Sequence, residues 1–411
     1  MTAPLAPKRR DRSHEYLVLF ALWLMVFSAS SQVIIIAPIL PRIGEALQIA
    51  EALQGWLITS YAVFLSIFAL IVGPISDKMG RRIVLIAGSG SMAVALWLHG
   101  VADSFISLLV VRAAAGAAGG MLSGAAVSYV GDYFPYSRRG WANGWVMSGV
   151  AFGQIIGIPI GTVLADQFGF KAAFVMFAVS MTLTTILIWL FVPQPKVERD
   201  EAALTISRAI STYMELIRRP AVAAASATYF LMFFSIGLYV IYLPTWLEGH
   251  LGVSGTVIAT LFFVGGLATV ITGPMAGKIS DSTGRKPLIV WSCLGLSVIM
   301  VLTTWVVTSI FTAYIVFGLT MVMIAMRISP LQSLMTALVE DQRRGALLSL
   351  AVAIGQVGIG IGGAVAGLAY TRYGYVSSTI VGAVAILAMA AIVQFRLPEP
   401  GEDDFSEPNI V

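Results

Sequence analysis

Two arginines, Arg112 and Arg327, stand about eight and about seventeen residues inside long apolar stretches of the sequence. A charge at the centre of a membrane-spanning helix costs about 3 kcal/mol or more, which makes such residues functional candidates. A guanidinium group binds carboxylates and phosphates through paired N–H donors, so we expect both arginines to line a central cavity and contact a substrate. Two structural alternatives stay open. Arg112 could tie helices together through backbone carbonyls, and Arg327 could extend its head group towards water.

Acidic groups are missing from the middle of the apolar stretches, because every Asp, Glu and His falls near a stretch end or in a connection. A cavity with arginines and without carboxylates should repel cations and favour anions or neutral amphiphiles. A buried carboxylate with a raised pKa is the usual group that gains and loses a proton inside a membrane, and the sequence offers none at this depth. The nearest acids are Asp77 and Asp132 at the inner rim and Asp103 at the outer rim. Further polar residues expected to contact a substrate are Gln32, Tyr229, Tyr239, Gln332, Gln154 and Gln356.

A ten-residue segment occurs twice, at 73–82 and at 277–286. Each copy has an aspartate, a glycine three positions later and then two cations, and each joins the end of one apolar stretch to the start of the next. A carboxylate beside cations can hold helix ends together by charge-assisted hydrogen bonds, although the charges could also serve only to fix the orientation of the chain. We predict a gating role for Gly73, Asp77, Gly80, Arg81, Arg82, Asp281, Gly284 and Arg285.

A ridge of glycines marks the fifth apolar stretch. Gly149, Gly153, Gly157 and Gly161 are spaced four residues apart, and Pro159 lies between the last two. Small residues at this spacing allow two helix backbones to approach closely inside a membrane. The spacing predicts close helix packing at this place.

Twelve apolar stretches position these side chains. Hydrophobic residues make up 58% of the chain and charged residues 11%, which is far from the composition of soluble proteins. Each stretch can cross about 30 Å of hydrocarbon as a helix, so we predict an all-α membrane protein with twelve transmembrane helices. The stretches are 16–41, 52–75, 83–101, 104–131, 141–165, 170–193, 221–247, 254–277, 287–308, 310–337, 346–370 and 375–397.

The sequence also repeats beyond the ten-residue segment. Gly153 and Gln154 have counterparts at Gly355 and Gln356, 202 positions later. Duplicated halves are typical of transporters whose binding site lies between two bundles. We therefore predict two pseudo-symmetric six-helix bundles joined by a linker. The linker should contain either an amphipathic helix that lies on the membrane surface or a partly ordered tether. The expected parts are a tail at 1–15, a bundle at 16–193, the linker at 194–220, a bundle at 221–397 and a tail at 398–411.

Most of the 25 Lys and Arg fall in the tails, in the linker and in connections on the same predicted side. The excess of cations on one side predicts that both termini are cytoplasmic in a multi-pass protein of the plasma (inner) membrane. The basic start leads into a stretch too long for a cleavable signal peptide. Cys293 is the single cysteine, so the chain forms no internal disulfide.

The repeated segment, Gly-x-x-x-Asp-x-x-Gly-Arg-(Arg/Lys), resembles the loop signature of the major facilitator superfamily. The resemblance covers about 16–397 and implies two bundles that open alternately to either side of the membrane. It implies that the segment latches the inner ends of the bundles in the outward-open state. Asp132, at the inner end of the fourth stretch, matches the acidic partner of this latch.

Two further segments resemble motifs of the same superfamily. The alanines and glycines that follow Arg112 resemble the fourth-helix motif, which implies that this arginine faces the cavity and takes part in proton coupling. The segment from Gly149 to Gly161 resembles the signature of proton-linked antiporters, with Ile158 inserted between Gly157 and Pro159. These resemblances favour the drug and metabolite antiporter type with twelve spans.

We therefore expect a secondary active transporter that couples proton entry to efflux of a small amphipathic neutral or anionic organic compound by alternating access. An organic-anion uptake or exchange carrier, with Arg112 and Arg327 as anion ligands, is the alternative. A membrane-embedded receptor or enzyme is a remote one, since the connections contain no catalytic or metal-ligand constellation. We expect a monomer in the lipid bilayer that uses a proton gradient and needs no cofactor, metal or nucleic acid.

Overall fold

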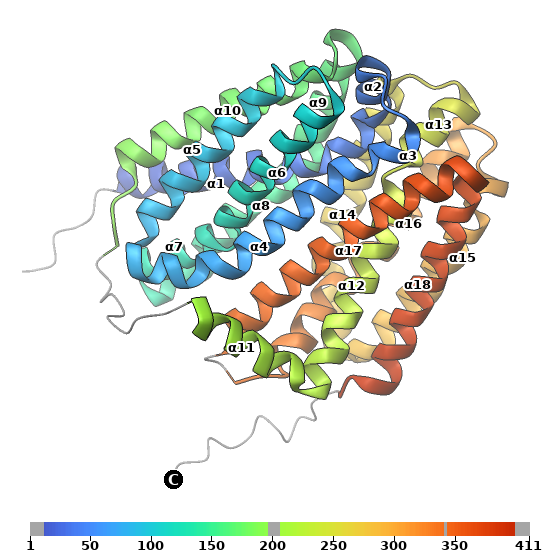
Figure 1. Ribbon diagram of the computed structural model, residues 1–411. Helices are drawn as coiled ribbons and strands as arrows, with labels where there is room; N and C mark the ends of the chain where they lie inside the picture. Colours follow the sequence, from blue (N-terminus) through green and yellow to red (C-terminus); the bar gives the residue numbers. More distant parts are fainter. Residues whose placement is uncertain (1–11, 196–205, 341–342, 399–411) are drawn as a thin grey trace, which may run out of the picture.

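The computed structural model describes residues 12–195, 206–340 and 343–398. These residues form α-helices with one π-helical turn, and twelve helical segments are long and apolar enough to span a membrane (Figure 1). Each of the twelve overlaps one predicted stretch, so the all-α membrane fold predicted from the sequence is confirmed. Of the predicted tails at 1–15 and 398–411, residues 1–11 and 399–411 lie outside the described residues, and 12–15 form the first turn of a helix.

The first six spans are built from eleven elements. These are α1 (Arg12–Ile34), α2 (Ile36–Leu47), α3 (Glu51–Gln54), α4 (Trp56–Met79), α5 (Arg81–His99), α6 (Phe105–Leu122), α7 (Ala125–Tyr133), α8 (Tyr136–Phe152), the π-turn η1 (Gly153–Gly157), α9 (Ile158–Phe168) and α10 (Phe170–Phe191). We call them the N half. In Figure 1 they run from blue to green and occupy one side of the molecule.

The remaining spans form the C half, which follows the linker helix α11 (Ile206–Arg218). Its elements are α12 (Pro220–Val240), α13 (Leu243–Leu251), α14 (Gly255–Thr283), α15 (Arg285–Val306), α16 (Ile310–Thr336), α17 (Arg344–Tyr373) and α18 (Tyr375–Arg396). The main packing pairs repeat between the halves, since α4 packs on α6 as α14 packs on α16, and α5 packs on α10 as α15 packs on α18. The exact boundaries of the two bundles stay a prediction.

Several spans are interrupted where the sequence disfavours a continuous helix. The fourth span breaks between α6 and α7 at Gly124, whose φ of +75° is easy for glycine and strained for other residues. The first span breaks between α1 and α2, and Pro41 lies inside α2. The seventh breaks before α13, which has a proline in its first turn, where the missing N–H costs nothing. The breaks in the first and seventh spans place the short helices α2 and α13 at one end of the molecule, together with α3, whereas α7 lies towards the opposite end (Figure 1).

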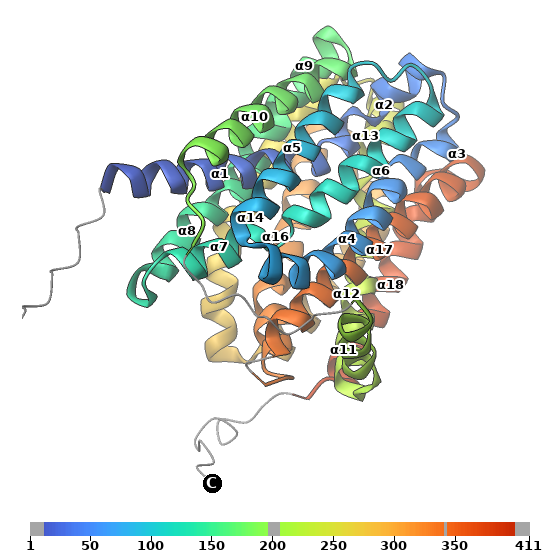
Figure 2. The ribbon, with the colours of Figure 1, turned by 60° about the vertical axis from the view of Figure 1, so that its left-hand side comes forward.

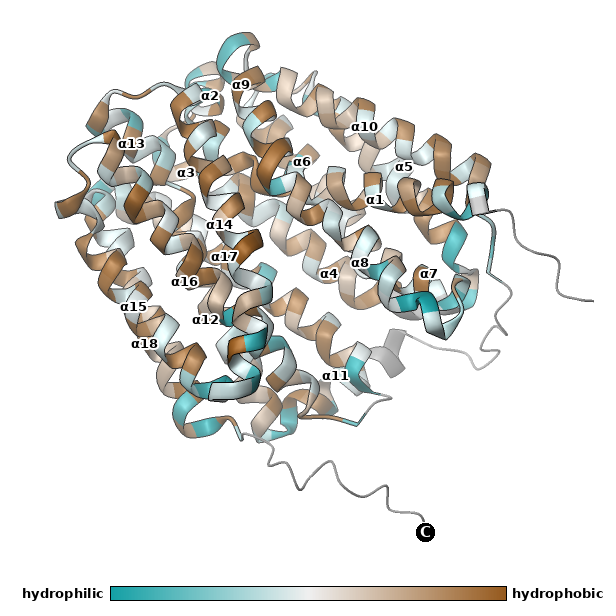
Figure 3. Ribbon diagram, turned by 180° about the vertical axis from the view of Figure 1, so that it is seen from behind, coloured by the Kyte–Doolittle hydropathy of each residue, from teal (hydrophilic) through white to brown (hydrophobic). Residues whose placement is uncertain are grey.

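We call this end the short-helix end, and the end with α11 the linker end. Figure 3 shows hydrophobic residues along the middle of the spans and more hydrophilic residues towards the two ends, as expected for a chain that crosses a bilayer. The halves contact one another where α9 meets α14, α13 meets α2, and α17 meets both α3 and α4. Along α4, Thr59 donates to the carbonyl of Gly360 at 2.6 Å and Ser66 to that of Ala353 at 2.9 Å.

The linker helix α11 connects the halves at the linker end, as the two ribbon views show (Figures 1 and 2). The Tyr213 hydroxyl donates to the carbonyl of Leu70 in α4 at 3.2 Å. On the other side, Arg343 donates to Glu215 at 2.7 Å, and this hydrogen bond holds the pKa of Glu215 below its ordinary value. Ile210, Met214 and Ile217 leave an apolar stripe exposed, as an amphipathic helix at a membrane surface would. The predicted amphipathic helix is present over 206–218.

Candidate substrate-binding cavity

A cavity of about 260 Å³ lies between the two halves. Its walls come from α1, α2, α4, α6, η1 and α9 on one side and from α12, α14, α16 and α17 on the other, and most of its residues are Ile, Val, Phe and Ala. Among the described lining residues there is no aspartate or glutamate. Its polar members are Tyr61, Arg112, Gln154, Thr269 and Gln356. The cavity therefore suits a molecule that is largely apolar and carries few hydrogen-bonding groups.

Arg112 lies at the wall of this cavity with its side chain fully buried. Its Nε donates to the carbonyl of Leu57 and its Nη1 to Oε1 of Gln32, both at 3.4 Å. The guanidinium carbon lies 4.4 Å from the centre of the Tyr61 ring, and Gln32 in turn donates to the Tyr61 hydroxyl at 3.0 Å. The Nη2 atom has no hydrogen-bond partner. The aromatic ring covers much of the charge, and Nη2 keeps unused N–H donors within the cavity wall.

His99 is a second buried polar group of the N half that sequence reasoning did not select. Its ring stacks on Phe174 at 4.1 Å, its Nδ1 lies 2.7 Å from the carbonyl of Ala95, and its Nε2 has no partner. The residue 204 positions later is Thr303, which hydrogen-bonds Tyr239 at 2.9 Å. The C half thus has uncharged hydroxyls where the N half has an imidazole.

Arg327 does not reach the cavity. The Arg327 side chain is fully buried in α16. Its neighbour Ile328 lines the cavity, whereas Arg327 does not. None of the guanidinium nitrogens of Arg327 has a hydrogen-bond partner. Tyr239 is likewise buried in the C half, with its hydroxyl near Thr303 and Thr320. Tyr229 and Gln332 lie beside each other outside the cavity lining. Of the predicted substrate-binding residues, Arg112, Gln154 and Gln356 reach the cavity and Gln32 supports Arg112 from behind.

Gln154 is positioned by the π-turn η1 inside the fifth span, a feature that often marks functional sites. The glycine ridge surrounds this turn and packs on α1. A Cβ on Gly149 would lie 2.7 Å from the carbonyl oxygen of Trp23, and one on Gly157 would lie 2.4 Å from Oγ of Ser31. Gly153 also contacts α1, and Gly161 contacts Ile35, the residue directly after α1. Pro159 lies in the first turn of α9. Close approach of α1 to the fifth span therefore depends on these glycines.

The first copy of the repeated segment forms the turn between α4 and α5. Gly80 has a φ of +103°, and the backbone N–H of Arg82 donates to the Gln194 side chain at 3.1 Å. Arg81 donates to Asp132 at 2.7 Å, which joins α5 to the end of α7. Arg82 donates to the carbonyl of Trp189 at 2.6 Å. These partners all belong to the N half or directly follow it.

Two other predicted gating residues of this copy, Gly73 and Asp77, lie in the last turns of α4, and their side chains are outside the part of the chain that the structure describes. In the second copy, Gly284 has a φ of +89° and Arg285 begins α15. Asp281 is exposed at the end of α14. The two copies therefore share the turn geometry that their glycines require.

We predict that Asp132→Asn lowers transport several-fold while insertion into the membrane stays normal. The neutral amide loses the charge-assisted hydrogen bond with Arg81, which is about twice as strong as a neutral one. Initial transport rates in vesicles with matched protein amounts provide the measurement. Lys78→Gln, which removes an exposed charge from the same turn, is the control. A rate for Asp132→Asn equal to that of the control would contradict a gating role.

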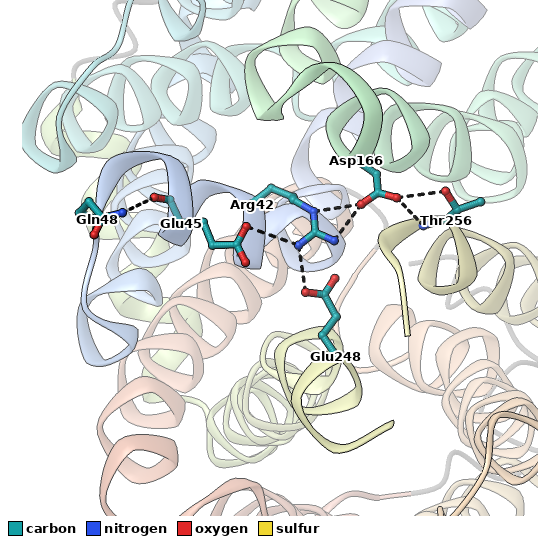
Figure 4. Close-up of polar contacts among 6 residues, drawn as sticks. All are labelled: Arg42, Glu45, Gln48, Asp166, Glu248 and Thr256. Carbon is teal, nitrogen blue, oxygen red and sulfur yellow. Dashed lines mark hydrogen bonds and ion pairs between the residues drawn. The ribbon is translucent and has the colours of Figure 1, made fainter. Parts of the chain in front are cut away.

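A cluster of charges at the short-helix end joins the two halves (Figure 4). Arg42 of α2 lies 2.8 Å from Asp166 of α9 and 3.1 Å from Glu248 of α13. Asp166 also accepts hydrogen bonds from the backbone N–H and the hydroxyl of Thr256, at 3.2 and 3.1 Å. Glu45 is more distant, at 3.8 Å. The side chains of Arg42, Asp166 and Glu248 are only 16–22% exposed, so water screens their interactions incompletely.

Sequence reasoning placed these three charges near stretch ends and did not pair them. One observation could have indicated the pairing: the cation and the two carboxylates stand at ends of apolar stretches that are predicted on the same side of the membrane. We call Arg42, Asp166, Glu248 and Thr256 the short-helix cluster. Because it contains residues of both halves, it joins the halves at this end.

Twelve spans in two similar halves with a cavity between them are the architecture of a membrane transporter. The chain matches the family model described as Major Facilitator Superfamily over residues 22–326 and 225–408, and it belongs to that family. The family consists of transporters, so the chain is a transporter and not an enzyme. Its lipid-spanning helices make it a multi-pass membrane protein.

Related proteins and structures agree with this assignment. The chain is 25% identical over 390 residues to an uncharacterized MFS-type transporter, YceJ, of Bacillus subtilis, covering 91% of this chain and 95% of that protein. It is 28% identical over 299 residues to multidrug resistance protein MdtG of Proteus mirabilis, covering 69% and 72%. A D-xylose–proton symporter structure matches with a TM-score of 0.75 at 16% identity, over 94% of this chain and 98% of that one.

A bacterial homologue of the human lysosomal transporter Spinster, in an inward-facing occupied conformation, matches with a TM-score of 0.74. Its identity is 16%, and the match covers 94% of this chain and 97% of that one. At this identity the likeness concerns the fold alone. Both structural matches extend over nearly all of the twelve spans.

Proposed function

We propose that the protein exports a small amphipathic organic compound in exchange for protons, by alternating access. The observation that carries the proposal is the cavity of about 260 Å³ between the halves, which is mostly apolar and has no described carboxylate. Relatives named multidrug resistance protein and the glycine segment from Gly149 to Gly161 support export of such a compound. The proposed location is a bacterial inner membrane, and the proposed functional unit is a monomer.

The proposed orientation places the linker end in the cytoplasm with both termini. The repeated segments at 73–82 and 277–286 and the linker helix all lie at this end, and their cations follow the positive-inside rule. The short-helix cluster then closes the outer side. We infer that the structure corresponds to an inward-facing state, in which the cavity is separated from the outside by Arg42 and its partners.

Neutral compounds fit the cavity better than anions do. The Arg112 charge is covered by Tyr61 and by two hydrogen bonds, and Arg327 lies outside the lining. An anion carrier of the alternative type needs both arginines at its ligand, so the geometry supports that alternative less. A neutral molecule with one acceptor for Nη2 of Arg112 avoids the cost of burying a second charge.

Purified protein in liposomes tests the proposal with radiolabelled chloramphenicol, a neutral amphipathic probe. We expect an imposed pH gradient to drive its accumulation, with a matching proton flux reported by pyranine. Liposomes without protein and liposomes with tetraphenylphosphonium, a cationic probe, are the controls. Accumulation that is indifferent to the pH gradient would contradict proton antiport, and preferential movement of the cation would contradict the assigned substrate class.

A further inference from the structure

A second hollow, separate from the central cavity, lies between α1 and α8 on the side of the N half. It measures about 240 Å³ and is lined by Tyr16, Leu19, Phe20, Trp23 and Trp145, and we call it the aromatic groove. Tyr16 and Trp145 are each 56% exposed and Phe20 is 48% exposed, although all three lie in membrane-spanning segments. Exposed aromatic residues within spans face lipid, so the groove opens towards the bilayer.

The two ends of the aromatic groove differ. At the deeper end, Trp23 stacks on Phe27 at 5.5 Å and donates to the hydroxyl of Ser148 at 3.1 Å. This fixed indole closes the groove. The other end lies towards the linker end, where the edge of Trp141 meets Tyr16 at 6.2 Å. The groove thus has an apolar floor and one end at the level of the membrane surface.

Cations stand at this surface end. Arg138 lies 4.9 Å over the ring of Trp141 and donates through Nη1 to Glu15 at 2.6 Å. It precedes Trp145 by seven residues on the same helix face, a rise of about 10 Å along α8. A phospholipid carries its phosphate group at one end of its acyl chains. A cation at one end of an apolar groove matches this arrangement.

Arg139 adds a second guanidinium in the same helical turn. Its Nε donates to the carbonyl of Phe134 at 3.1 Å, and its head group lies 5.9 Å from the ring centre of Tyr136. Within the described residues, Nε and Nη2 of Arg138 and the two Nη atoms of Arg139 have no protein acceptor. Among the described residues, Glu15 pairs with Arg138 and forms no ion pair with Arg139, so one carboxylate stands against two neighbouring guanidinium groups of this turn and leaves an excess positive charge. Guanidinium groups with free N–H edges bind phosphate oxygens.

We propose that the aromatic groove binds an anionic phospholipid, with an acyl chain between α1 and α8 and the phosphate against Arg138 and Arg139. The net positive charge selects an anionic head group over a zwitterionic one. The proposal depends on the membrane placement of the spans and does not depend on which compound the transporter moves. Its failure would therefore leave the proposed function untouched.

Native mass spectrometry of the detergent-purified full chain tests the head-group site. Dioleoylphosphatidylglycerol is titrated against dioleoylphosphatidylcholine, and we expect one phosphatidylglycerol to be retained at least tenfold more tightly. The variant Arg138→Gln/Arg139→Gln is expected to lose this preference. The matched control, Arg218→Gln/Arg219→Gln, removes two adjacent arginines from the same end and should keep it. Equal retention by both variants would overturn the proposal and indicate only non-specific charge attraction.

A second measurement leaves the arginines intact and tests the acyl-chain site. Phosphatidylglycerol with brominated chains quenches nearby tryptophans, and the contribution of Trp145 is obtained by comparing the wild type with Trp145→Phe. We expect this contribution to saturate at a low lipid fraction for brominated phosphatidylglycerol and to need a severalfold higher fraction for brominated phosphatidylcholine. Identical quenching curves for the two lipids would overturn the proposal even if the arginine variants misfold.

Discussion

Replacement of Arg42 by glutamine is expected to open the short-helix end of the transporter. The substitution removes the guanidinium group that pairs with Asp166 and Glu248, and it leaves two partly buried carboxylates near each other across the two halves, with Thr256 still donating to Asp166. Truncating one partner of a desolvated charge pair costs about 2 kcal/mol or more. That cost corresponds to a shift of roughly thirtyfold in the ratio of closed to open molecules. Net transport is expected to fall as well, because the cavity no longer closes to the outside.

The opening is measured with an introduced cysteine. Ala37 lines the cavity and is 4% exposed, and the native Cys293 is buried, so Ala37→Cys provides a single reactive reporter. We expect a membrane-impermeant maleimide added from the short-helix side to label it much faster in the Arg42→Gln background. Adding Glu248→Gln should slow labelling again, since a neutral pair of amides removes the repulsion.

Lys171→Gln is the matched control for Arg42→Gln. Lys171 pairs with Asp103 near the same end, yet both residues belong to the N half and the pair is exposed. Its loss should leave the labelling rate unchanged, because exposed pairs contribute little. If Arg42→Gln and Lys171→Gln give the same rate, the short-helix cluster does not hold the halves together.

Replacement of Arg112 by glutamine is expected to lower transport of chloramphenicol by at least tenfold without loss of membrane insertion. The shorter side chain cannot donate to Leu57 and Gln32 together, cannot cover the Tyr61 ring, and cannot present Nη2 to a ligand. Initial rates and equilibrium binding in the same liposomes separate a loss of affinity from a loss of turnover. Unchanged affinity together with an unchanged rate would show that Arg112 only ties helices together.

Arg327→Gln is the informative comparison, because Arg327 is equally buried and lies off the cavity wall. We expect it to keep the affinity for the probe. Removing a buried charge without a hydrogen-bond partner should instead raise the thermal unfolding temperature. Loss of binding in Arg327→Gln would restore the anion-carrier alternative.

Sequence patterns predicted the twelve spans well, because a membrane helix needs about twenty apolar residues whatever it packs against. Through the resemblance to a known motif they pointed to Asp132 as an acidic partner of the repeated segment; Arg81 contacts it within the N half, and the latch between the bundles stays a prediction. They could not tell that Arg112 reaches the cavity while Arg327 does not. One residue of rotation, about 100°, separates Arg327 from Ile328, and a span that is apolar all round carries no signal of which face meets the other half.

The short-helix cluster shows a second limit of sequence reasoning. Arg42, Asp166 and Glu248 come from three different spans, and only the tertiary arrangement brings them within hydrogen-bonding distance. The break at Gly124 was missed for a local reason. Glycine is tolerated within membrane helices, so its presence alone did not indicate a positive φ.

The anchoring of α11 is unequal between its two neighbours. Tyr213 donates a hydrogen bond to α4, whereas Glu215 pairs with Arg343, and Arg219, the next residue after the helix, lies 3.8 Å from Glu340. Ion pairs are stronger than a hydrogen bond between neutral groups, so in the proposed rocking motion we expect α11 to move with the C half. Its exposed stripe of Ile210, Met214 and Ile217 would then move through the lipid head groups in every transport cycle. The viscosity of that leaflet would therefore limit the rate of transport.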